Sequence, residues 1–238
     1  MRIGAKIGVI LIIACLAMLL VPVGHASAFG EELTTPTGGT GATGDQSLLE
    51  DELHKYNKNQ DVWFMLMLVA FLMMFIRKFE WGVALAVLLV TVTSFLAYMA
   101  VEEFFFDKAW NQDLMLMGVI CSITVVIAIG MFLGTVKMWQ YLLVGAIFGP
   151  MFAFIEWFMF TYLDGVVDPG GSILVHMCAA YFGMGVILTI REKRAFHEPM
   201  YTTTHSVTFV WLASMLLWML WPSFVTALLP ADQVTWGM

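Results

Sequence analysis

An aspartate and a histidine share a segment that is otherwise almost entirely apolar. In DPGGSILVHMCAAYFGMG, residues 168–185, Asp168 precedes a proline and His176 follows eight residues later. An ionisable side chain at the centre of a bilayer costs on the order of 3 kcal/mol, so one that is present there is a candidate functional residue. A neutral imidazole also offers one hydrogen-bond donor and one acceptor. We therefore predict that Asp168 and His176 belong to a functional site inside a membrane.

Structural interpretations of both residues stay open beside the functional one. Asp168 followed by Pro169 is typical of a helix N-cap with proline at the first helical position, where the carboxylate satisfies free backbone amides. His176 would lie about 12 Å deeper in the same helix, where a lone histidine is usually a hydrogen-bonded core residue and less often a haem or metal ligand. A haem held by His176 and His205 is disfavoured because the two are expected toward opposite faces of the membrane. We predict no cofactor and no metal.

Further polar and aromatic residues are expected near the level of Asp168. Glu156 lies late in the preceding apolar segment, where it would help to make the outer mouth acidic and attract cations. The last apolar segment ends in WLASMLLWMLWPSF, which brings Trp221 and Phe224 toward the same level. Such rings commonly form the aromatic belt of a membrane protein. The alternative is a cation–π surface or a hydrophobic gate.

The elements that would carry these residues are membrane-spanning helices. Of the 238 residues, 61% are hydrophobic and only 12% are charged. Six apolar segments approach the roughly 20 residues that span a bilayer; they cover about residues 61–76, 81–101, 114–134, 138–160, 172–190 and 206–229. The sequence therefore predicts an all-α membrane protein with six transmembrane helices. The net charge of −7 argues against a nucleic-acid partner, whereas membrane lipid is an expected one.

Charged residues at the segment ends predict the orientation. Basic residues follow the first, third and fifth segments, and the other ends are mainly acidic. The positive-inside rule then puts both termini of the mature chain outside the plasma or inner membrane. Residues 1–28 are typical of a secretory signal peptide. Residues 29–57, rich in glycine, threonine and acidic residues, are expected to be a flexible extracytoplasmic segment, and residues 58–238 the transmembrane domain.

Three stretches closely resemble one family of membrane transporters. DPGGSILVHMCAAYFG, LLWMLWPSF and NQDVWFMLMLVAFLMMFIRKF are similar to the Rhesus glycoprotein branch of the ammonium transporter/Rhesus family. The resemblance implies a channel for ammonia or ammonium, with carbon dioxide and methylamine as further candidate substrates, and the trimer typical of the family. Family members recruit ammonium at an outer vestibule, remove its proton and pass neutral ammonia along a narrow pore lined by two facing histidines. The fold implied is the first five-helix half of that channel plus one helix.

The matching motifs assign roles to individual residues by resemblance. His176 would be the first of the two histidines, and Asp168 would stabilise the recruitment site and its helix. Phe224 would be one of two stacked phenylalanines that gate the vestibule, with Trp221 beside it on the substrate pathway. Glu156 resembles the glutamate at the outer end of the fourth span.

The sequence also departs from the family pattern. Ile120 stands where the second gate phenylalanine is expected, Val119 where an acidic residue usually precedes it, and Val207 where Rhesus proteins carry an aspartate. Family pores form between two five-helix halves of opposite orientation, whereas six segments are found here. The chain would then be truncated, part of a split channel whose partner membrane chain supplies the second half, or a remnant with another use. The alternative function is a non-transporting structural subunit of a membrane complex. No nucleophile–base pair or phosphate-binding loop indicates an enzyme.

Overall fold

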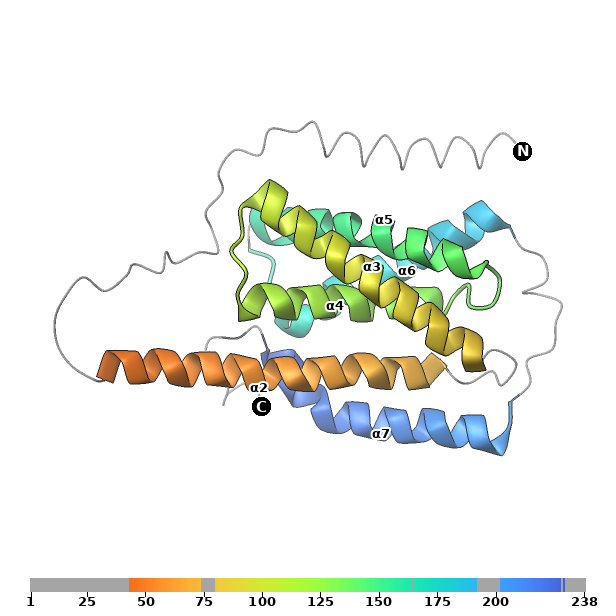
Figure 1. Cartoon of the computed structure of the whole chain (residues 1–238), viewed down its shortest axis with the longest axis horizontal. Helices are drawn as coiled ribbons and strands as arrows, with labels where there is room; N and C mark the ends of the chain where they lie inside the picture. Colours follow the sequence, from red (N-terminus) through yellow and green to blue (C-terminus); the bar gives the residue numbers. More distant parts are fainter. Residues whose placement is uncertain (1–42, 74–79, 164, 192–201, 228, 230–238) are drawn as a thin grey trace.

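The computed structural model describes residues 43–73, 80–163, 165–191, 202–227 and 229. Its long helices are α2 (Thr43–Leu72), α3 (Glu80–Phe106), α4 (Gln112–Ile129), α5 (Met138–Trp157), α6 (Ser172–Ile190) and α7 (Thr204–Thr226). A π-helix, η3 (Phe158–Tyr162), continues α5, and a 3-10 turn, η4 (Pro169–Gly171), precedes α6. This architecture confirms the predicted all-α class (Figure 1). The predicted signal peptide, residues 1–28, lies outside the described residues.

Five helical segments are long and apolar enough to cross a membrane, which makes the chain an integral membrane protein. They are Gly82–Phe106, Gln112–Ile129, Met138–Tyr162, Pro169–Ile190 and Thr204–Thr226, and they correspond to the second to sixth apolar segments of the sequence. The first apolar segment, residues 61–76, lies partly in α2 and partly outside the described residues. Its helix differs from the five because Lys55, Lys58 and Asp61 adjoin its apolar part.

Helix α2 begins well before the position that the composition suggested. Residues 43–57 are helical, although they belong to the stretch expected to be flexible. After Gly44 this stretch has no glycine or proline and contains three leucines and two glutamates, which favour helix, while acidic residues near the start suit the positive end of the helix dipole. Figure 1 shows this part of α2 extending past the other helices.

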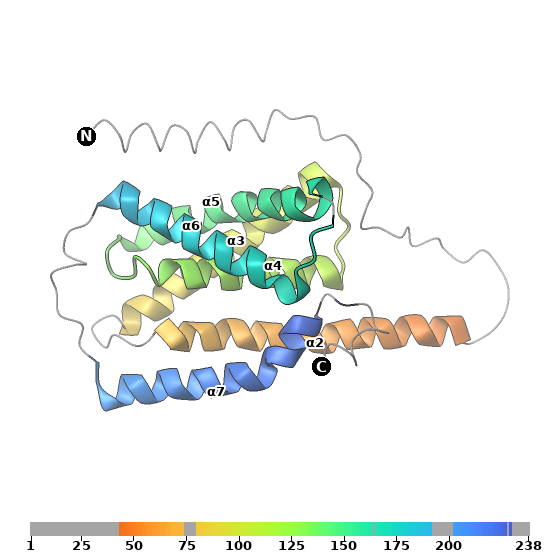
Figure 2. The same ribbon diagram turned by 180° about the vertical axis from the view of Figure 1, so that it is seen from behind.

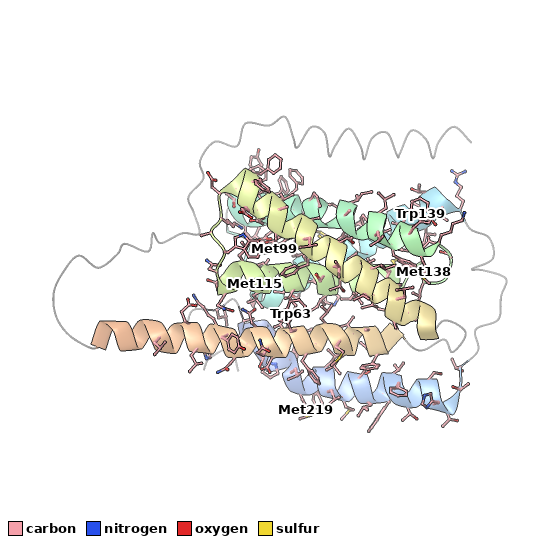
Figure 3. The ribbon with its side chains drawn as sticks, in the orientation of Figure 1. Trp63, Met99, Met115, Met138, Trp139 and Met219 are labelled. Atoms are coloured by element: carbon pink, nitrogen blue, oxygen red, sulfur yellow. The ribbon has the colours of Figure 1, made fainter. Side chains whose placement is uncertain are left out.

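The bundle is built around α4. Residues 118–126 of α4 are all buried, because α2, α3, α5 and α6 surround it. Figures 1 and 2 show α3 crossing α4 and α5 obliquely and α7 lying beside α2. Met99, Met115, Met138 and Met219 lie on four different helices (Figure 3), as is usual for methionines that fill irregular gaps in packing.

Two glycines set the distance between α3 and α5. A Cβ atom on Gly149 would lie 2.7 Å from both the Ser94 carbonyl oxygen and the Tyr98 nitrogen, and one on Gly145 would lie 2.7 Å from the Val90 carbonyl oxygen. The two backbones therefore touch directly, as small residues at four-residue spacing allow in membrane helices.

We expect Gly149→Ala to lower the free energy of unfolding by about 1–3 kcal/mol, because the added methyl group must displace backbone rather than a flexible side chain. The matched control is Gly185→Ala on α6, where a Cβ would meet no atom within 4 Å. The unfolding midpoint in detergent is the measurement. Equal midpoints for the two variants would contradict the backbone contact.

Candidate functional site

Asp168 holds the start of α6. Its Oδ1 accepts the Ile173 amide and its Oδ2 the Leu174 amide, both at 2.8 Å, and Oδ1 also accepts the Ser172 hydroxyl at 3.2 Å. The side chain is only 8% exposed. The predicted capping role is therefore present, and all of these contacts are to the first turn of the helix.

The cap reaches further along the chain than a simple N-cap would. Gly170 and Gly171 have φ of 69° and 65°, a left-handed conformation that glycine adopts without strain. The regular helix thus begins at Ser172 rather than directly at Pro169, and Asp168 bonds amides five and six residues ahead. His176 consequently lies one turn after the start of α6 at Ser172.

The end of α7 packs on this glycine turn. A Cβ on Gly170 would lie 2.9 Å from the Val225 Cα and 3.6 Å from the Phe224 Cδ1. Phe224 is buried, and its ring centroid lies 5.5 Å from that of Trp221, which is 42% exposed. The structure therefore brings Asp168, Phe224 and Trp221 together where α6 begins and α7 ends.

His176 lies on the exposed side of α6. Its Nδ1 is 2.7 Å from the Ser172 carbonyl oxygen, and since a carbonyl can only accept, Nδ1 carries the proton. In the neutral ring Nε2 is then a hydrogen-bond acceptor. His176 thus shares the first turns of α6 with the cap of Asp168 and presents an acceptor outside the bundle.

Glu156 belongs to a different cluster. It accepts the Tyr98 hydroxyl at 2.7 Å and lies 3.6 Å from Lys108 Nζ. Lys108 Nζ is 2.5 Å from Glu102, whose side chain is only 1% exposed. Burial by itself would lower the pKa of Lys108, but the nearby carboxylates of Glu156 and Glu102 outweigh it and raise the pKa above the usual 10.5. The contacts recorded for Glu156 are thus to α3 and the α3–α4 loop, and they do not include Asp168, Phe224 or Trp221.

Sequence reasoning missed Lys108 and Tyr98. The available signal was Lys108 itself, a basic residue in the otherwise acidic stretch 102–113.

Of the positions that depart from the family pattern, Val119 and Ile120 are completely buried in α4, and Val207 is 55% exposed on α7. Within the described residues no group of three histidine, cysteine, aspartate or glutamate side chains could hold a metal ion.

We expect Lys108→Met to destabilise the protein by up to about 3 kcal/mol, because it leaves the carboxylate of Glu102 buried without its cation. The raised pKa means that the stabilisation by Lys108 is fully present below about pH 10.5 and is lost as the pH rises through the higher folded-state value. Unfolding midpoints of both proteins between pH 7 and 11 measure this. Adding Glu102→Gln to Lys108→Met should recover part of the loss, and a double variant less stable than Lys108→Met would contradict the pairing.

Comparison with known proteins identifies the family. A model described as the Ammonium Transporter Family matches residues 45–237. Rhesus-like glycoprotein B of Dictyostelium discoideum is 32% identical over 52% of this chain and 20% of its own length. Ammonium transporter Rh type C of Oryctolagus cuniculus is 30% identical over 76% of this chain and 40% of its own length.

A solved structure agrees with these relatives. The Nitrosomonas europaea Rh50 structure, whose title concerns conduction by the Rhesus protein family of channels, has a TM-score of 0.74 at 28% identity and matches 79% of this chain and 52% of its own. The chain therefore spans about half the length of that structure and less than half the length of the two curated relatives. With the match of residues 45–237 covering most of the sequence, the chain belongs to the ammonium transporter family, in its Rhesus branch.

Proposed function

We propose that this chain is a component of a Rhesus-type channel that conducts ammonia or ammonium. The observation that carries the proposal is the position of His176. It lies on the exposed side of α6, one turn after the start of the helix that Asp168 caps, and we call this start the entrance. A histidine exposed from a membrane bundle is costly against lipid, so this side of α6 is better suited to water, substrate or further protein. Methylamine and carbon dioxide remain candidate substrates. We propose no enzymatic activity.

The proposed pathway uses three features of this entrance. Trp221 would offer its exposed ring to an arriving ammonium ion, and the buried ring of Phe224 would lie beside it at the entrance. Neutral ammonia would then pass inward more cheaply than the ion, donating an N–H to Nε2 of His176. Asp168 would act through the helix rather than on the substrate, because the contacts of its two oxygens go to the first turn of α6.

The exposed sides of α6 and α7 support a pathway shared with further membrane helices. Tyr181 on α6 is 70% exposed, and Trp218 and Met219 on α7 are each 74% exposed. We propose that these helices are completed by a partner membrane chain or by copies of this chain in a trimer. The end of the bundle that holds Asp168 would face outward from the plasma or inner membrane, since Lys137 precedes α5 and Arg191 follows α6 at the other end.

One observation favours the alternative of a non-transporting structural subunit. Ile120, at the position of the expected second gate phenylalanine, is an aliphatic side chain completely buried in the core. A gate built from two stacked rings would therefore lack one partner at that position, and Glu156, engaged with Tyr98 and Lys108, would not be free to bind ammonium.

We expect His176→Ala to reduce ammonia flux roughly fivefold, because one hydrogen bond to the passing molecule is worth about 1 kcal/mol. The protein is purified from its own membranes with whatever chains accompany it, and the internal pH of vesicles is followed after an ammonium gradient is applied. His205→Ala is the matched control, since the ring of His205 packs edge-to-face against Phe209 near the opposite end of α7. Unchanged flux in His176→Ala would remove His176 from the mechanism.

Native mass spectrometry of the gently purified protein separates the two functions. For a channel component we expect a second membrane chain bound in fixed stoichiometry. A preparation that contains only this chain and shows no ammonia flux would instead support the structural subunit.

A further inference from the structure

A buried lysine joins two helices that are far apart in the sequence. Lys58 of α2 is 6% exposed, and its Nζ donates to the carbonyl oxygen of Thr226 at the end of α7, at 2.6 Å. The same carbonyl accepts the Leu229 amide at 3.1 Å. Burial lowers the pKa of Lys58, and a buried ammonium group is tolerated only where hydrogen bonds replace water. A cation at a helix C-terminus also interacts favourably with its free carbonyls.

A second contact lies one turn away. Asp61 of α2 accepts the hydroxyl of Ser223 of α7 at 2.6 Å. Lys58 and Asp61 are three residues apart on α2, and Ser223 and Thr226 are three residues apart on α7, so each pair shares one helix face. We call these two contacts the α2–α7 clamp.

The clamp contacts the last turn of α7, which follows a proline. Pro222 lies inside α7 and has no amide hydrogen, so the helix loses one backbone hydrogen bond there. The Thr226 hydroxyl bonds the Pro222 carbonyl at 2.8 Å, which ties the turn to itself rather than to α2. The stacking of Phe71 on Phe209, with ring centroids 5.9 Å apart, joins α2 to α7 nearer its other end. The clamp and the glycine turn therefore oppose movement of residues 223–226, together with the burial of Phe224 in the core.

This last turn carries Phe224. Its neighbour Val225 lies against Gly170, where even one added carbon would come within 2.9 Å of the Val225 Cα. A shift of the turn away from α2 would move Phe224 relative to η4 and the capped start of α6. Ser223 and Thr226, which the clamp holds, thus lie on the same turn of α7 as Phe224.

We propose that Lys58 and Asp61 are positioning residues that lock the last turn of α7 and so hold Phe224 over the start of α6. Neither residue contacts the proposed path of the substrate; both act through Ser223 and Thr226. The effect on transport rests on the proposed function, whereas the locking of the turn does not.

Hydrogen–deuterium exchange of the full chain, purified with its native partners, tests the locking. We expect Lys58→Met and Asp61→Ala to speed exchange of residues 223–229 about tenfold, as loss of a hydrogen bond to a charged group would do, while residues 204–215 exchange as before. Lys58→Arg keeps a donor and should restore most of the protection. Lys55→Met is the matched control, because Lys55 pairs with Asp113 of α4.

The outcomes are distinct. Unchanged exchange at residues 223–229, an equal increase along all of α7, or the same increase in Lys55→Met would overturn the locking. Ammonia flux measured on the same samples tests its consequence: lower flux in Lys58→Met with recovery in Lys58→Arg supports positioning of Phe224, and unchanged flux despite faster exchange overturns it. Absence of flux in the wild-type protein would count against the proposed function alone, since the exchange result is independent of transport.

Discussion

The backbone amides at the start of α6 must be satisfied within the protein, because hydrocarbon offers them no hydrogen-bond partner. The Asp168 carboxylate meets this need for Ile173 and Leu174, at 2.8 Å each. The carboxylate can accept these two amides because the chain makes a left-handed turn at Gly170 and Gly171. The same turn leaves room for the end of α7 to pack on Gly170. The depth of His176, the packing of Phe224 and the closeness of α7 to η4 all follow from this one capped turn.

Much of the fold could be predicted from the sequence, because a membrane-spanning helix must present a long apolar run. The segments 81–101, 114–134, 138–160, 172–190 and 206–229 each correspond to an observed span. The helix over residues 43–57 was harder to predict. The composition of residues 29–57 as a whole, rich in glycine, threonine and acidic residues, indicated a flexible segment, whereas helix formation depends on the propensities of the individual residues.

The end of the bundle at which the candidate residues lie could be predicted from the sequence, but not the neighbours that their side chains face. Asp168, Phe224, Trp221 and Glu156 all lie toward the same end of the bundle, as the alternation of charged segment ends indicated. Hydrophobic spans show little polar periodicity, so the sequence does not indicate which neighbour each residue faces. Glu156 turns toward Tyr98 and Lys108, and this pairing is set by the crossing of α3 over α5 at Gly145 and Gly149. The sequence also did not indicate the left-handed backbone conformation of the two glycines before Ser172, because Asp-Pro is equally compatible with an ordinary helix start.

The contact between Glu102 and Lys108 has a consequence for how the chain is made. The two residues are six positions apart, Glu102 in the last turns of α3 and Lys108 in the loop that follows, so their pairing requires only that short segment. A membrane protein is inserted progressively from its N-terminus, and this hairpin can neutralise the buried carboxylate before α5 has been synthesised. Glu156 then arrives at a cation that is already in place, so the order of synthesis spares the bilayer an isolated charge on α3.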